Sequence, residues 1–158
     1  MAFGTPFQLI DVLLSHNVPF VVIGGYAVTF HGFVRATEDI DIVFLRTEDS
    51  EYTLLAALRE VNAKWIGDEI DSATGLERTY PVSMDFIRAN RLMMLVTDCG
   101  YLDVFDFIPG FPNQPASELF KDHVENDRGK YVSLSWLRKM KTVSGRVKDQ
   151  LDLENLPE

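Results

Sequence analysis

The sequence predicts an α/β (α+β) fold in one domain, residues 1–158, with a central sheet flanked by helices. Short apolar runs typical of buried strands alternate with stretches that repeat apolar residues at helical spacing. Two later apolar runs, Leu92 to Thr97 and Tyr101 to Ile108, are separated only by Asp98-Cys99-Gly100, which predicts an antiparallel hairpin. A chain of 158 residues that is 46% hydrophobic and holds 11 Phe is long enough to bury one core.

The first half of the chain carries clear start and stop signals. Thr5-Pro6-Phe7-Gln8 predicts a helix start, because Thr5 can cap, Pro6 suits the first helical position and Gln8 can complete a capping box. Asn17 is a suitable end for this helix. The next expected elements are a strand over 20–23, a helix over 26–31, a strand over 40–45 and a helix capped by Thr47 that runs through Val61.

The second half is less regular, and the segment from Lys64 to Asn90 is the least clear. Asp71 to Gly75 is typical of a loop, and Ser83 to Ile87 is compatible with a strand. The elements expected after the hairpin are a short helix over 116–123, a turn over 126–129, a strand over 131–134 and helices over 135–142 and 146–153.

Composition excludes several classes of protein. The formal net charge of -9 argues against broad nucleic-acid binding, which needs a basic face. Cys99 is the single cysteine, so a disulfide framework and a thiolate zinc site are both excluded, and a reducing cytoplasm is the expected location. The start of the chain lacks a basic leader, and no apolar run approaches the roughly 20 residues of a membrane span.

Two motifs within residues 21–44 carry chemistry. Gly24 and Gly25 follow an apolar strand and open a helix, so a phosphate could approach their backbone and the first N–H groups of that helix. Asp39 and Asp41 lie one residue apart in the next strand, so both carboxylates point to the same face. Paired carboxylates that share a site with substrate phosphates are a common way to hold Mg²⁺ or Mn²⁺.

A metal-dependent phosphoryl-transfer site usually needs a third acidic ligand. Asp103 is the preferred candidate, because it is a polar residue in an apolar strand just after a tight turn. Asp85 and Asp106 remain alternatives, although Asp106 would face away from Asp103 in a regular strand.

The motifs together resemble the nucleotidyltransferase superfamily, which has the DNA polymerase β-like fold. Residues 24–41 show the run Gly-Gly-Tyr-Ala-Val, His-Gly, Arg-x-Thr and Asp-x-Asp of small stand-alone members related to abortive-infection toxins. Thr97, Gly100, Leu102 and Asp103 match a second motif of that subgroup, and Lys141 with the Gly-Arg-x-Lys-Asp segment at 145–149 matches a third. The resemblance implies a minimal nucleotidyltransferase fold with a mixed or antiparallel central sheet.

The resemblance also implies roles for particular residues. Asp39 and Asp41 would bridge the metals, and Asp103 would complete the site. Arg35, Lys141 and Arg146 would contact the phosphates, unless Arg35 merely pairs with Asp39 or Glu38. Three other residues are expected to be structural: His31 near a helix end, and Lys148 and Asp149 as an exposed pair on the last helix.

The implied activity is Mg²⁺-dependent transfer of a nucleoside monophosphate from a nucleoside triphosphate to a hydroxyl acceptor. The acceptor is not visible in the sequence; a tRNA end, a protein and a small molecule are the candidates. The chain is too short for the additional domain of larger superfamily members, so a protein partner or a homo-oligomer could complete the site. The alternative is a non-catalytic module that binds a nucleotide or a partner, as one half of a toxin–antitoxin pair.

Overall fold

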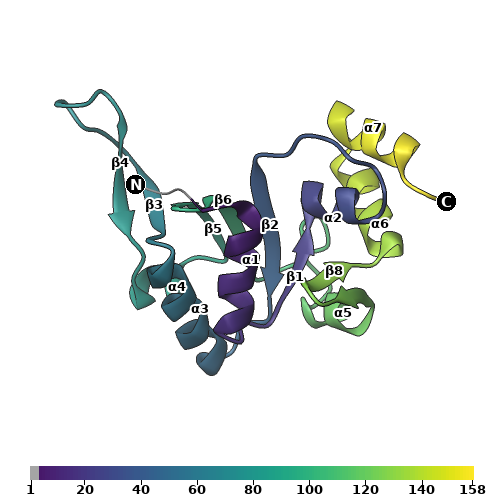
Figure 1. Cartoon of the computed structure of the whole chain (residues 1–158), viewed down its shortest axis with the longest axis horizontal. Coiled ribbons are helices and arrows are strands. Elements are labelled where there is room, and N and C mark those ends of the chain that lie inside the picture. The colour runs from purple at the N-terminus through teal and green to yellow at the C-terminus, as the bar shows by residue number, and fades with distance from the viewer. Residues whose placement is uncertain (1–3) are drawn as a thin grey trace.

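The computed structural model describes residues 4–158 (Figure 1). The helices are α1 (Pro6–Ser15), α2 (Gly24–Phe30), α3 (Glu48–Glu60), α4 (Met84–Ala89), α5 (Ser117–Lys121), α6 (Leu134–Ser144) and α7 (Val147–Asn155). The strands are β1 (Phe20–Ile23), β2 (Asp39–Phe44), β3 (Lys64–Ile70), β4 (Glu77–Pro81), β5 (Leu92–Thr97), β6 (Gly100–Phe105), β7 (His123–Asn126) and β8 (Gly129–Val132).

All of these strands belong to one mixed sheet with the order β4-β3-β5-β6-β2-β1-β8-β7. The pairs β2–β6 and β1–β8 are parallel, whereas the other neighbours are antiparallel. The predicted α/β (α+β) class with a mixed central sheet flanked by helices is therefore confirmed. In Figure 1 the β3–β4 hairpin projects at one end of the molecule and α7 lies toward the other.

Strand alternation in β2 divides the core between the two faces of the sheet. Ile40, Ile42 and Phe44 point to one face, where they pack with the buried sides of α1, α3 and α4. Val43 points to the other face and packs with residues of α2, α5 and α6. Because Asp39 and Asp41 have the same parity as Val43, they share this second face.

The predicted helix starts are present. Gln8 N–H donates to Thr5 Oγ1 at 3.3 Å, and Thr5 N–H donates to Gln8 Oε1 at 2.6 Å, which completes the capping box. Thr47 caps α3 by accepting a 3.0 Å hydrogen bond from Ser50 N–H. Asn17 adopts a left-handed backbone with φ of 58°, which ends the first helical segment.

The segment from 64 to 90 contains the clearest error in the sequence prediction. The strand expected over 83–87 is wrong, because Ser83 caps a helix there by accepting a hydrogen bond from Phe86 N–H. Ile87 of this helix is fully buried against the α1 and α3 side of the sheet. The β3–β4 hairpin and the short strand β7 were not predicted, since their strands are mostly exposed and lack a continuous apolar run.

No helix within residues 4–158 combines the length and the apolar character needed to cross a bilayer.

Candidate active site

Three predicted carboxylates lie on one face of the sheet. Asp39 and Asp41 come from β2, and Asp103 comes from β6, which runs parallel to β2. Asp103 is directly opposite Asp41 in the register of this pair, and Tyr101 is opposite Asp39. Asp41 and Asp103 therefore lie side by side on neighbouring strands, and Asp39 lies two residues before Asp41 on β2.

The electrostatics of these carboxylates follow from their burial and proximity. Burial, the charge and hydrogen bond of Asp103, and the charge of Asp39 raise the pKa of Asp41 to about 7, against a smaller opposing effect of Lys141. Burial and the charge of Asp39 also raise the pKa of Asp103, although its hydrogen bond with Asp41 acts in the opposite direction. The Asp41–Asp103 pair therefore keeps a proton to a higher pH than an isolated carboxyl group would when no cation is bound.

Within residues 4–158, no group of three or more His, Cys, Asp or Glu side chains has the arrangement of a metal site. Asp39, Asp41 and Asp103 thus do not form a closed ligand shell by themselves. Their roles as metal ligands remain predictions. Mg²⁺ sites commonly take only one or two carboxylates from the protein and obtain other ligands from water and substrate phosphates.

The two alternative third carboxylates are placed differently. Asp106 follows β6 and accepts from Arg46 Nε at 2.7 Å and from Arg91 Nε at 2.9 Å. Asp85 is exposed in the first turn of α4. Neither residue lines the cavities beside Asp41.

The backbone at Gly24 and Gly25 lies so close to neighbouring side chains that neither position has room for a Cβ. Gly24 has φ of +69°, and a Cβ at this position would collide with the Asp41 carboxylate. A Cβ on Gly25 would come to 2.5 Å from Thr37 Oγ1. The helix begins at Gly24, two residues earlier than expected, so its first turn lies directly against the acidic strand.

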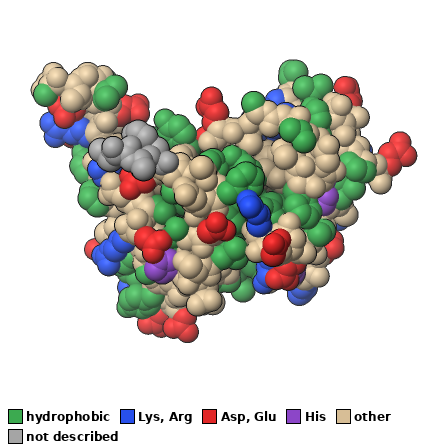
Figure 2. All heavy atoms as spheres, in the orientation of Figure 1, with side chains coloured by type: hydrophobic (Ala, Val, Ile, Leu, Met, Phe, Trp, Pro, Cys, Tyr) green, Lys and Arg blue, Asp and Glu red, His purple; other side chains and the backbone are tan. Residues whose placement is uncertain are grey.

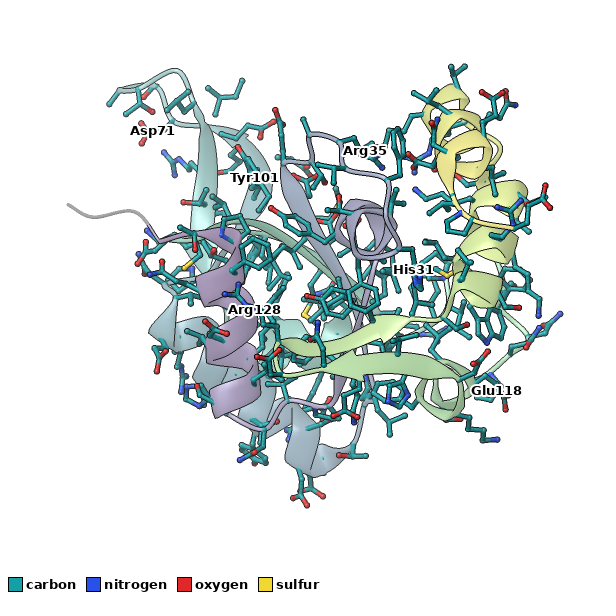
Figure 3. All side chains as sticks on the ribbon, turned by 45° about the vertical axis from the view of Figure 1, so that its right-hand side comes forward. His31, Arg35, Asp71, Tyr101, Glu118 and Arg128 are labelled. Atoms are coloured by element: carbon teal, nitrogen blue, oxygen red, sulfur yellow. The ribbon has the colours of Figure 1, made fainter. Side chains whose placement is uncertain are left out.

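The three predicted phosphate-contacting cations are held in a network with two acidic residues of α7. Arg35 binds Asp152 through two hydrogen bonds of 2.7 and 2.9 Å. Lys141 Nζ lies 2.9 Å from Asp149 Oδ1 and 3.0 Å from Asp152 Oδ2. Figure 3 shows Arg35 on the loop before β2, on the side that faces α7.

Asp149 also accepts a 2.8 Å hydrogen bond from Arg146 Nε. Asp149 and Asp152 are fully buried, so the prediction of an exposed Lys148–Asp149 pair is wrong for Asp149. Burial alone would raise the pKa of both carboxyls, but hydrogen bonds from Arg146, Ser144 and Lys141 to Asp149, and from Arg35 and Lys141 to Asp152, lower both below the ordinary range. Lys148 is exposed as expected, and no ion pair is found for it within residues 4–158.

Two cavities meet at the carboxylates. The larger, of about 480 Å³, is bordered by all three carboxylates and by an apolar wall formed by Phe105, Pro109, Leu137, Met140 and Val143. The smaller, of about 350 Å³, is bordered by Asp39 and Asp41, by the Gly24–Gly25 turn and by Arg35, Thr37 and Lys148. Lys141, Arg146 and Lys148 border both cavities. All eight predicted site residues therefore line at least one of them.

Sequence reasoning missed Asp152 and gave Asp149 no role in the site. The two are spaced i, i+3, which places them on one face of a helix next to a preceding basic helix, and this spacing could have indicated the network. His31 has the structural role that was predicted for it. Its Nε2 lies 2.8 Å from the carbonyl oxygen of Val132.

The fold is that of nucleotidyltransferases. A presumed nucleotidyltransferase from Thermotoga maritima, known from its crystal structure, matches with a TM-score of 0.54 and 19% identity, over 93% of this chain and 86% of that one. JHP933 from Helicobacter pylori matches with a TM-score of 0.46 and 14% identity, over 92% of this chain and 62% of that chain. A presumed nucleotidyltransferase from H. pylori matches with a TM-score of 0.43 and 14% identity, over 85% and 55%.

No family model matches the sequence, and no curated protein matches it either. The likeness to the solved structure from T. maritima shows the fold alone.

Proposed function

We propose that this protein is a Mg²⁺-dependent nucleotidyltransferase that transfers a nucleoside monophosphate from a nucleoside triphosphate to a hydroxyl acceptor. The observation that carries the proposal is the set of carboxylates on one sheet face, with Asp41 and Asp103 in register on parallel strands and Asp39 beside them. These carboxylates lie where two cavities meet, so a ligand that spans both cavities passes over them.

The donor set fits a hard divalent cation. Asp39, Asp41 and Asp103 offer only oxygen ligands, and their mutual proximity raises the pKa of Asp41 to about 7. A divalent cation would replace the proton that these mutually repelling carboxylates hold. When bound, Mg²⁺ would neutralise charge on the phosphoryl oxygens during transfer.

Residues of the chain itself would bind the phosphates and accept the proton of the acceptor. The Gly24 turn and the cations around the smaller cavity would hold the β- and γ-phosphates, and exposed Lys148 would supply a mobile positive charge. Asp103 would accept the proton of the acceptor hydroxyl, whose oxygen attacks the α-phosphorus. The bond from the α-phosphorus to the bridging oxygen then breaks, and pyrophosphate leaves.

The acidic network behind the site would fix the positions of its cations. Asp149 and Asp152 tie Lys141 and Arg35 together across α6, α7 and the loop before β2. Each cation is thus held at the cavity wall before substrate arrives, so less conformational entropy is lost on binding. A buried carboxylate without its cation would be strongly unfavourable, which makes the network cooperative.

A tRNA end, a protein hydroxyl and a small molecule such as an aminoglycoside are the acceptor classes to be tested, in a cytoplasmic setting. The net charge of -9 disfavours a large RNA acceptor. On the face shown in Figure 2, Lys and Arg side chains are scattered and do not gather into a basic patch.

The test is transfer of α-labelled nucleoside triphosphates to each acceptor class in the presence of Mg²⁺ or Mn²⁺, with release of pyrophosphate measured in parallel. We expect transfer by the wild type and loss of transfer in Asp41→Asn and Asp103→Asn. Asp85→Asn is the matched control, because it removes an exposed carboxylate outside the site. Full activity in Asp41→Asn would rule out the proposed role of the carboxylates.

A non-catalytic partner-binding module, as one half of a toxin–antitoxin pair, is the second candidate. The observation that favours it is an uncovered part of the sheet beside the site, where Met94 is 62% exposed and Tyr101 is 50% exposed. A stable complex with the product of a neighbouring gene, formed equally by wild type and Asp41→Asn in the absence of any transfer, would favour this candidate.

A further inference from the structure

Resting on the proposed nucleotidyltransferase function, we propose that the larger cavity binds the nucleoside part of the triphosphate through apolar contacts and with little discrimination between bases. The cavity lies between β6 and α6. Phe105 of β6 forms one side, and Leu137, Met140 and Val143 of α6 form the other.

The position of the cavity relative to the carboxylates determines which part of the nucleotide it can take. Both cavities are bordered by Asp39, Asp41 and Gly24. If the α-phosphate lies over the shared carboxylates, the β- and γ-phosphates extend into the smaller cavity, because of the two cavities only this one is bordered by Gly25 and Arg35. The nucleoside then has the larger cavity available on the other side of the α-phosphate.

The acceptor has a separate approach. In the register of the sheet, Met94 of β5 is opposite Asp103, which is opposite Asp41. Met94 is 62% exposed, so the sheet surface next to Asp103 is uncovered. An acceptor that arrives over β5 and β6 can present its hydroxyl to Asp103 without displacing a nucleoside bound between Phe105 and α6.

The lining explains the expected lack of base selectivity. A cavity of about 480 Å³ is within the size range of small-molecule sites. Ser144 is the one uncharged polar side chain in its lining. Ser144 Oγ already accepts a 3.1 Å hydrogen bond from Arg146 Nε, and a hydroxyl can donate or accept, so it does not select one base edge. The other polar residues of the lining are charged, and the proposed mechanism assigns them to the metal, to the phosphates or to the network on α7: Asp39, Asp41, Asp103, Lys141, Arg146, Lys148 and Asp149. The wall left for the nucleoside is apolar, and discrimination by such a wall is weak.

A binding experiment with two probes separates the nucleoside from the phosphates. Non-hydrolysable analogues of ATP, GTP, CTP and UTP, and inorganic tripolyphosphate, are titrated calorimetrically into the protein with Mn²⁺. We expect each nucleotide to bind more tightly than tripolyphosphate, and the four nucleotide affinities to agree within about tenfold. Equal affinity for nucleotides and tripolyphosphate would overturn the nucleoside site, and a preference for one base above about a hundredfold would overturn the lack of selectivity.

Matched methionine variants locate the nucleoside. Met140→Ala should weaken nucleotide binding several-fold and leave tripolyphosphate binding unchanged, whereas Met94→Ala on the uncovered sheet should change neither. The opposite pattern would place the nucleoside on the sheet surface and overturn the inference.

Photocrosslinking with 4-thiouridine triphosphate gives an independent readout. We expect the label on peptides that contain residues 105–110 or 137–144, and a label confined to β5 would contradict the proposal. If the wild type binds neither nucleotide nor tripolyphosphate, the proposed function itself fails, and this result differs from every outcome that overturns the nucleoside site alone.

Discussion

Replacement of Asp41 by Asn should stabilise the metal-free protein at pH 8. The carboxyl of Asp41 is partly buried beside Asp103 and Asp39, and its pKa rises from 3.8 to about 7. Each pKa unit corresponds to about 1.4 kcal/mol, so ionised Asp41 costs up to about 4 kcal/mol of folding free energy above pH 7. We expect a gain of about 2–4 kcal/mol for Asp41→Asn, because Asn removes the charge but keeps the size of the side chain.

The pH dependence gives the sign of this effect. Because the folded state holds the proton of Asp41 more tightly than the unfolded state, wild-type stability should fall as pH rises from about 4 to about 7 and then level off. Urea unfolding without metal at pH 5, 6, 7 and 8 should show this fall in the wild type and a much flatter profile in Asp41→Asn. Parallel profiles for the two proteins would refute the electrostatic reasoning.

Divalent metal should reverse the effect. Mg²⁺ or Mn²⁺ well above its Kd should stabilise the wild type by about 1–3 kcal/mol at pH 8 and by less at pH 5, where a proton competes for Asp41. The variant with both Asp39→Asn and Asp41→Asn should show no such rise. An equal rise in wild type and double variant would show that the metal binds elsewhere.

The remaining predictions concern the supports of the site. Gly24→Ala should lower stability by roughly 1–2 kcal/mol, because the backbone at this position has a φ of +69°. The variant should also bind Mn²⁺ more weakly, because the new Cβ would meet the Asp41 carboxylate. An unchanged Mn²⁺ affinity in calorimetry would contradict this. Lys141→Met should lower stability by up to roughly 3–5 kcal/mol, because it removes the buried cation between Asp149 and Asp152, which keep only Arg146 and Arg35 as partners. Lys148→Met should leave the melting temperature unchanged and weaken tripolyphosphate binding. Similar melting temperatures for the two Lys variants would show that the buried network adds little.

The elements with strong local signals were predictable from the sequence. Thr5 and Thr47 cap their helices by the expected hydrogen bonds, because capping depends on residues within one turn of each other. The Asp39–Asp41 spacing placed both carboxylates on one face, because side-chain direction alternates in any regular strand. The position of Asp103 beside Asp41 was anticipated from the family resemblance, since strand order is not visible in local sequence.

Other features depended on contacts between distant segments. The helix at 84–89 has apolar residues that are compatible with either a strand or a helix, and the cap provided by Ser83 decides between them. Asp149 looked like an exposed acidic residue because its buried partner Lys141 meets it only after α6 and α7 pack together, whereas its pair with Arg146 is local to the start of α7. The space next to Gly25 looked open in the sequence, but Thr37 from the following loop occupies it.

Asp39, Asp41 and Asp103 are proposed to hold the metal that binds the triphosphate. The most direct measurement is anomalous diffraction from crystals soaked with Mn²⁺ and a non-hydrolysable nucleoside triphosphate. We expect a Mn²⁺ peak within ligand distance of Asp39 and Asp41, with Asp103 beside it and the α-phosphate on the opposite side. A bound triphosphate whose Mn²⁺ touches none of these three carboxylates would contradict the account.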